Sequence, residues 1–211
     1  MSDINQTSPS PSEPIIFIDW DDTLYPTSWL RSSGDAPSPR SLAPVFEKIE
    51  KTVKAFLSVA QAVGKTYIVT SASGTWVEHC LSSFLPGLLD SAPEIIPSNY
   101  YRDRTREKKM DFREMMIFRK HQAMISVVKD ETSFISIGDS HVEQYALHRI
   151  PGIRKSVKLK HKPSLEELCE QLENLTTTLP LLVNYRSSID LEISNASVHS
   201  QFVAIDKLLN I

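Results

Sequence analysis

Two aspartates that stand two residues apart could carry out acid–base chemistry together. Asp19 and Asp21 follow the apolar run 15–18, and Trp20 separates them. Where a chain leaves a strand in extended form, residues i and i+2 lie on the same side, so both carboxylates face the same space. Their repulsion tends to raise the pKa of one carboxyl group. One aspartate can then stay ionised and attack while the other carries a proton, as acid–base catalysis requires.

Polar side chains also follow two other apolar runs. Thr70 ends one run, Gly138 and Asp139 end a later one, and Glu143 stands about one helical turn further on. Because ligands bind at the carboxyl ends of the strands in an open parallel sheet, we expect these residues to meet Asp19 at one edge. Carboxylate oxygens such as these suit Mg²⁺, which keeps bound waters and accepts a phosphate oxygen.

The elements that must position these residues are short apolar runs that alternate with helical patterns. A short, continuous run rich in β-branched or aromatic residues is typical of a strand buried on both faces. The alternation predicts an α/β protein, a Rossmann-like three-layer sandwich with a central, mostly parallel sheet. The predicted strands are 15–18, 66–69, 94–96, 133–137, 157–159 and an edge strand at 190–194; the predicted helices are 44–62, 76–85, 111–128, 141–148 and one that Ser164 caps.

Composition and length predict one domain behind a disordered leader. The chain has 211 residues with 41% hydrophobic and 23% charged content, which is ordinary for a folded domain. Residues 1–14 are rich in Ser and Pro and predict disorder, which leaves 15–211 as a single domain. No apolar run approaches the length of a membrane span, and Cys80 and Cys169 have no metal-ligand spacing. We therefore expect a cytoplasmic protein, with the nucleus as a second location.

The charge of the chain gives no clear nucleic-acid signature. The formal net charge is −3, although basic residues concentrate in 102–120 and again in 154–162. These two stretches are either solvated faces or surfaces that attract phosphate, and the sequence leaves both interpretations open. The oligomeric state is also left open.

Taken together, the motifs resemble those of the haloacid dehalogenase superfamily over roughly residues 15–160. The first motif of that superfamily, an apolar strand that ends in Asp-x-Asp-x-Thr, is similar to FIDWDDTL. Thr70 at the end of YIVT resembles the hydroxyl of the second motif, and Gly138 and Asp139 in FISIGD resemble the acidic fourth motif. More narrowly, a eukaryotic subgroup found in protists and plants has segments similar to DWDDTLYPTSWL, SGTWVE, SIGDSHVE and KPSLEELCEQL.

The resemblance implies a magnesium-dependent phosphohydrolase. Asp19 would attack phosphorus and form an aspartyl-phosphate. Asp21 would protonate the leaving oxygen and then activate water, and its backbone carbonyl would bind the metal. Thr70 would donate a hydrogen bond to the phosphoryl group, and Asp139 would complete the metal site with Glu143 beside it. Asp21 favours a phosphatase over a dehalogenase, because cleavage of a carbon–halogen bond needs no acid for the leaving group.

The superfamily also has a lysine near the nucleophile, which offsets the negative charge there. The matching position in this chain is Arg113, which follows Phe112, and Lys109 one turn earlier could take the role instead. An arginine is a planar fork rather than a compact point charge, so the exchange is not neutral. Two alternatives therefore stay open, a catalytically weak or inactive phosphate-binding scaffold and a phosphotransferase.

The intervals between the motifs are filled by ordinary fold elements, apart from a loop near residues 26–42. This predicts little or no cap and an open site. We therefore expect a phosphorylated substrate, which could be as large as a macromolecule, with the basic stretch at 102–120 steering it toward the site.

Overall fold

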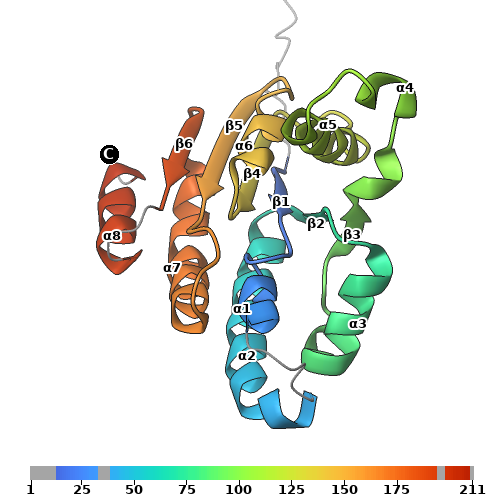
Figure 1. Cartoon of the computed structure of the whole chain (residues 1–211). Helices are drawn as coiled ribbons and strands as arrows, with labels where there is room; N and C mark the ends of the chain where they lie inside the picture. The colour runs from blue at the N-terminus through green and yellow to red at the C-terminus, as the bar shows by residue number, and fades with distance from the viewer. Residues whose placement is uncertain (1–12, 33–38, 194–197, 210–211) are drawn as a thin grey trace, which may run out of the picture.

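The computed structural model describes residues 13–32, 39–193 and 198–209. They form a central sheet of six parallel strands, in the order β3-β2-β1-β4-β5-β6, with helices packed on both faces (Figure 1). This is the predicted α/β, Rossmann-like three-layer sandwich. The strands are β1 (Ile15–Ile18), β2 (Lys65–Thr70), β3 (Glu94–Pro97), β4 (Ser133–Gly138), β5 (Ile153–Lys158) and β6 (Ile189–Glu192). The helices are α1 (Thr27–Ser32), α2 (Pro39–Val63), α3 (Gly74–Phe84), α4 (Arg104–Glu107), α5 (Phe112–Ile125), α6 (His141–Leu147), α7 (Leu165–Asn184) and α8 (Val198–Leu209), with short 3₁₀ turns η1 (Pro86–Leu88) and η2 (Ser98–Tyr101).

Strand β1 is buried on both faces of the sheet, as its continuous apolar run predicts. Ile16 and Ile18 pack in the larger apolar cluster, with α2, α3, α7 and α8. Ile15 and Phe17 point to the other face and pack in a smaller cluster with α5 and α6. All four side chains are fully buried or nearly so, because successive residues of a strand alternate between the two faces. The end of β1 is therefore a rigid base for the residue that follows it.

Strands β1 and β4 are neighbours at the centre of the sheet. Ile18 pairs with Ile137, and the backbone amide of Asp19 donates a hydrogen bond to the carbonyl of Ile137 at 2.9 Å. The two chains therefore leave the sheet side by side, so Asp19 and Asp139 start from adjacent positions at its carboxyl edge.

The elements at the C-terminal end differ most from the predictions. Strand β5 covers Ile153–Lys158 rather than 157–159, because two basic residues, Arg154 and Lys155, hide its pattern. The edge strand predicted at 190–194 corresponds to β6 (Ile189–Glu192). The last residue of the predicted range, Ser194, lies outside the described residues. Helices α1, α4 and α8 were not predicted. The predicted cap at Ser164 is confirmed at the start of α7, where Ser164 forms a capping box with Glu167.

The segments between the motifs belong to the sheet and its covering helices, and the described residues contain no separate cap domain (Figure 1). The predicted loop near 26–42 contains α1 and the start of α2, and residues 33–38 lie outside the described part. Most of the predicted leader, residues 1–12, also lies outside it. Pro14 is described, and its carbonyl accepts a hydrogen bond from the amide of Lys65 at 2.9 Å.

None of the helices in the described ranges combines the length and the apolar character that crossing a bilayer requires.

Candidate active site

Three buried carboxylates and one buried lysine meet at the carboxyl edge of the sheet. The Nζ atom of Lys120, in α5, lies 2.7 Å from Oδ1 of Asp19 and also contacts Glu143. Lys120 is 1% exposed. One oxygen each from Asp19, Asp139 and Glu143 lies within 4.8 Å of the others. The residues predicted from two separate strand ends are therefore brought together, and a lysine lies among them.

The glycine before Asp139 is required by this packing. A Cβ atom on Gly138 would lie 2.5 Å from Cγ of Glu143, which is too close for any real side chain. Glu143 therefore folds back over the end of β4, where its other oxygen accepts a hydrogen bond from Oγ of Ser140 at 2.5 Å. Ser140 also caps α6, the helix that carries Glu143.

The buried site contains more acidic groups than basic ones, and this shifts the pKa values of its carboxyl groups. Burial, with further contributions from Glu143 and Asp139, raises the pKa of Asp19 to about 8, although Lys120 opposes the shift. Burial and then Glu143 raise the pKa of Asp139 to about 6. Burial also works against ionised Glu143, but Lys120 and Ser140 outweigh it and lower the pKa of that carboxyl group. Lys120 pairs with Asp19 and Glu143. Among the described residues, Asp139 pairs only with the ring of His161, so a further positive charge would favour the ionised form of all three carboxyl groups.

The donor set fits a hard divalent cation. All candidate ligands are carboxylate oxygens, which suit Mg²⁺ rather than a softer metal. Glu143 is already engaged by Lys120 and Ser140, whereas Asp19 and Asp139 each use only one oxygen in the described hydrogen bonds. Asp19 and Asp139 are therefore the better direct ligands, with Glu143 behind them.

Asp21 stands at the mouth of the site. Its Oδ1 atom accepts a hydrogen bond from the hydroxyl of Thr27 in α1 at 2.5 Å, and its side chain is partly exposed. The neighbouring Asp22 has a left-handed backbone (φ 55°), and its carboxylate accepts hydrogen bonds from the amide and hydroxyl of Ser28. Asp22 thus fixes the turn into α1, which in turn holds Asp21 toward the site.

The predicted hydroxyl of Thr70 does not face the site. Thr70 is fully buried at the end of β2, and its Oγ1 atom accepts a hydrogen bond from the amide of Ala72 at 3.0 Å. Ser71 lines the cavities beside Asp21, and Thr70 does not. Because side chains alternate in direction along an extended chain, a shift of one residue moves the hydroxyl to the site. Ser71, and not Thr70, therefore lines the cavity that contains Asp19.

The prediction of Lys109 or Arg113 beside the nucleophile is wrong. Both are exposed, and the guanidinium of Arg113 lies over the ring of Tyr145 at 5.0 Å. Lys120 comes seven residues after Arg113, which is two helical turns further along α5 on the same face. The signal for it was a lysine on the apolar stripe that also carries Met124.

His161 is a site residue that the sequence interpretation missed. Its Nδ1 atom lies 2.7 Å from Oδ2 of Asp139, and its ring lines the same cavity as Asp19. It stands on the loop after β5, which is held by a hydrogen bond from the amide of Leu159 to the carbonyl of Gly138 at 2.7 Å. The next residue, Lys162, has φ 49°, a left-handed conformation that turns the loop back toward α7. A single histidine in a polar loop carries no signal in sequence.

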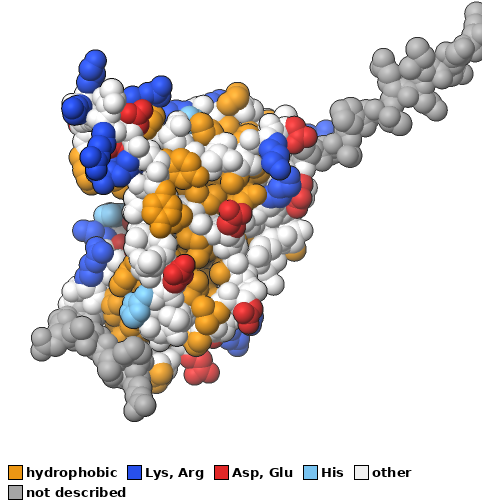
Figure 2. Space-filling view, turned by 90° about the vertical axis from the view of Figure 1, so that its right-hand side faces the viewer, with side chains coloured by type: hydrophobic (Ala, Val, Ile, Leu, Met, Phe, Trp, Pro, Cys, Tyr) orange, Lys and Arg blue, Asp and Glu red, His pale blue; other side chains and the backbone are white. Residues whose placement is uncertain are grey.

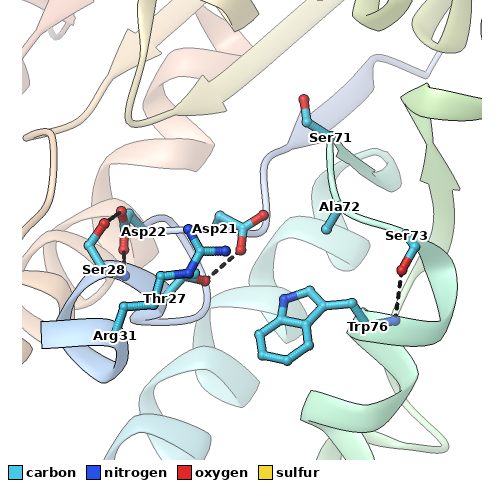
Figure 3. Close-up of a pocket in the computed structure, with 9 residues that line it drawn as sticks. All are labelled: Asp21, Asp22, Thr27, Ser28, Arg31, Ser71, Ala72, Ser73 and Trp76. Atoms are coloured by element: carbon cyan, nitrogen blue, oxygen red, sulfur yellow. Dashed lines mark hydrogen bonds between the residues drawn. The ribbon is translucent and has the colours of Figure 1, made fainter. Parts of the chain in front are cut away.

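Two cavities have Asp21 in their lining. The smaller has a volume of about 210 Å³ and contains the buried acids and lysine. The larger, of about 580 Å³, lies between α1 and the start of α3 (Figure 3). Both cavities are lined by Asp21, Asp22 and Ser71.

Comparison with models of known protein families, with curated protein sequences and with solved structures found no match for this chain.

Proposed function

We propose that the protein is a magnesium-dependent phosphomonoester hydrolase that acts through an aspartyl-phosphate on Asp19. The observation that supports this most strongly is the buried pair of Asp19 and Lys120 at the end of the central strand, 2.7 Å apart, with a second strand-end acid beside it. A nucleophilic carboxylate needs a fixed position and a cation that offsets the charge of the incoming phosphate, and this arrangement provides both.

In the first step the phosphate ester occupies the smaller cavity, where Lys120 and the hydroxyl of Ser71 stabilise its oxygens. An oxygen of Asp19 attacks phosphorus, and the bond from phosphorus to the ester oxygen breaks. Asp21 gives its proton to that departing oxygen, so the product leaves as a neutral alcohol or phenol.

In the second step Asp21, now ionised, takes a proton from water. The resulting hydroxide attacks phosphorus, and the bond between phosphorus and the Asp19 oxygen breaks. This releases inorganic phosphate and restores both aspartates.

Asp19 and Asp139 would hold Mg²⁺, with Glu143 next to them. When bound, the ion would neutralise part of the charge on the phosphoryl group. His161 would keep Asp139 in a fixed orientation through the hydrogen bond to its other oxygen.

The reason for considering a catalytically weak or inactive scaffold no longer applies. It depended on Arg113 standing where a lysine is expected, and Lys120 contacts Asp19 directly. No observation favours a phosphotransferase over a hydrolase, and the two differ only in the acceptor of the second step. Added alcohols separate them, because a transferase would yield new phosphate esters in place of inorganic phosphate.

The substrate would be a phosphorylated molecule. That this molecule is a macromolecule stays a prediction. The exposed basic residues of the α4 region gather at one corner of the molecule, at the upper left of Figure 2. The cytoplasmic or nuclear location also stays a prediction; both cysteines, Cys80 and Cys169, are buried and free.

The experiment that tests this proposal is release of phosphate from an aryl phosphate with Mg²⁺, with Mg²⁺ replaced by Ca²⁺, and with excess chelator. We expect turnover with Mg²⁺, loss with chelator and weak activity with Ca²⁺, whose looser coordination lets the attacking carboxylate bind through both oxygens. Asp19→Asn should abolish turnover, whereas the matched control Asp130→Asn, on an exposed loop, should not. Full activity in chelator, or in Asp19→Asn, would refute the proposal.

A further inference from the structure

The larger cavity, which we call the leaving-group cavity, can hold the organic part of a substrate. Its volume of about 580 Å³ falls within the range of about 300–1,000 Å³ that is common for small-molecule sites. Asp21 lines both this cavity and the smaller cavity around Asp19. If phosphorus lies beside Asp19 and Asp21 protonates the ester oxygen, the group attached to that oxygen must project into the leaving-group cavity.

Most polar groups of this cavity are used within the protein. The hydroxyl of Thr27 donates to Asp21, and that of Ser28 donates to Asp22. The hydroxyl of Ser73 accepts a hydrogen bond from the amide of Trp76 and so begins α3. The first two bonds hold the α1 wall to the turn after β1, and the third begins α3, which forms the other wall (Figure 3).

Two side chains of the lining have groups that these bonds do not use. Arg31 reaches from α1 toward Asp21, and Trp76 lies on the opposite wall, on α3 (Figure 3). Within the described residues, no carboxylate or carbonyl accepts a hydrogen bond from the guanidinium of Arg31. The indole of Trp76 is held edge-on against the ring of Tyr25, with centroids 6.3 Å apart, and stays partly exposed.

The chemistry of these two side chains defines a ligand. A guanidinium pairs best with a planar carboxylate or a phosphate, through two parallel hydrogen bonds. A fixed indole offers a flat apolar surface on which an aromatic ring packs. Asp22 also lines the cavity as a carboxylate, and Arg31 is the one basic side chain among the described residues of the lining, so a second negative charge on the ligand is most favourable near Arg31.

We propose that the leaving-group cavity binds an aryl phosphate whose ring carries a second anionic group, with the ring against Trp76 and the anion on Arg31. This inference rests on the proposed function, because that function decides which side of Asp21 the leaving group occupies. It makes Arg31 and Trp76 the residues that determine substrate specificity.

The test measures binding without turnover. The full chain with Mg²⁺ is titrated by calorimetry with two non-hydrolysable probes, benzylphosphonate and 4-carboxybenzylphosphonate. The added carboxylate should tighten binding about tenfold, the gain expected for a charge-assisted hydrogen bond. Arg31→Gln should bring the two affinities within about twofold, while the matched control Arg113→Gln, an exposed arginine of α5, should keep the preference.

Trp76 is tested in the same way. Trp76→Leu should weaken both probes and keep the carboxylate preference, and Trp76→Phe, which retains a ring, should restore most of the affinity. The inference is overturned if the wild-type protein shows no preference or if the preference survives in Arg31→Gln. It is also overturned if Arg31→Gln weakens both probes equally, since Arg31 would then act on the shared phosphonate.

The two proposals fail in different ways. A carboxylate preference that depends on Arg31, without hydrolysis of any ester, would support this cavity assignment and refute the proposed function. Hydrolysis of phenyl phosphate without any carboxylate preference in binding would support the proposed function and refute the cavity assignment.

Discussion

Among single residues, Lys120 is the buried cation that joins two of the three acids of the site. Its ammonium group lies between Asp19 and Glu143 and is shielded from water. Burial works against the charge of Lys120, but the two carboxylates outweigh it and raise its pKa, so the lysine stays charged. Removing one partner of such a buried group leaves charges without compensation, which typically costs about 3–5 kcal/mol.

We therefore expect Lys120→Met to lower both the free energy of unfolding, by about 3–5 kcal/mol, and the rate of phosphate release, by about a hundredfold or more. Urea unfolding and steady-state kinetics measure the two effects. Arg113→Met is the matched control, because Arg113 lies over Tyr145 on the surface. It should leave the free energy of unfolding nearly unchanged and should change the rate of phosphate release by no more than about twofold. Equal effects of the two substitutions would show that Lys120 has no special role.

His161 gives a second prediction at this scale. Its hydrogen bond is to Asp139, so it should act on metal affinity through the orientation of that carboxylate. We expect His161→Ala to weaken Mg²⁺ binding about tenfold to a hundredfold in calorimetry, and His161→Asn, which keeps a donor, to restore part of it. His141→Ala, a partly exposed histidine bonded to Gln144, is the control. Unchanged Mg²⁺ affinity in His161→Ala would show that His161 does not orient Asp139 for metal binding.

At the scale of elements, β5 contains a charge that the rest of the fold must accommodate. Lys155 is 1% exposed, and its Nζ atom donates a hydrogen bond to the carbonyl of Val183 near the end of α7, at 2.8 Å. Burial lowers the pKa of this lysine to about 8. The folded protein therefore gives up this proton at a lower pH than the unfolded chain does.

This predicts how stability depends on pH. Below about pH 8 both states carry the proton, and the folded state bears the full cost of the buried charge. Between about pH 8 and the ordinary lysine value of 10.5 the unfolded chain binds more protons, so stability rises with pH. Lys155→Met should be more stable than wild type near pH 7, by up to about 3 kcal/mol, and the difference should shrink toward pH 10.5. A difference in unfolding free energy that stays constant with pH would contradict this.

Elements with a plain apolar pattern could be predicted from the sequence, whereas the charges buried within elements could not. β1 and β4 follow from continuous apolar runs, and the place of Asp19 and Asp139 follows from them. Lys120 and Lys155 are charged side chains in buried positions, and only the tertiary structure supplies the groups that compensate them. The exchange of Thr70 for Ser71 is a one-residue shift at a strand end, which pattern alone does not fix.

At the scale of the whole molecule, basic side chains collect on the segment that leads into α5. The segment precedes the helix that carries Lys120, and Met116 of that helix lines the smaller cavity. Glu107 pairs with Arg119, so these two charges cancel. The exposed basic residues of the segment are Arg102, Arg104, Arg106, Lys108 and Lys109, and exposed Arg113 follows in the first turn of α5.

If this surface steers a large anionic substrate, kcat/KM on a phosphorylated peptide or oligonucleotide should fall several-fold between low and moderate salt. A small aryl phosphate touches too little of the surface to respond in the same way. Replacing Arg104, Arg106 and Lys108 by Gln should reduce the salt effect on the large substrate alone. A small metabolite that wins by orders of magnitude, with no salt dependence, would refute a macromolecular substrate.

The measurement that tests the central claim most directly is the location of the covalent phosphate. Asp21→Asn should accumulate phosphoenzyme from an aryl phosphate with a good leaving group, because such a group departs without an acid while hydrolysis lacks its base. Borohydride reduces an aspartyl-phosphate to homoserine, which peptide mass spectrometry locates. We predict homoserine at position 19 only when both ester and Mg²⁺ are present. Turnover of the ester without modification at Asp19, or with modification at another residue, would contradict the account.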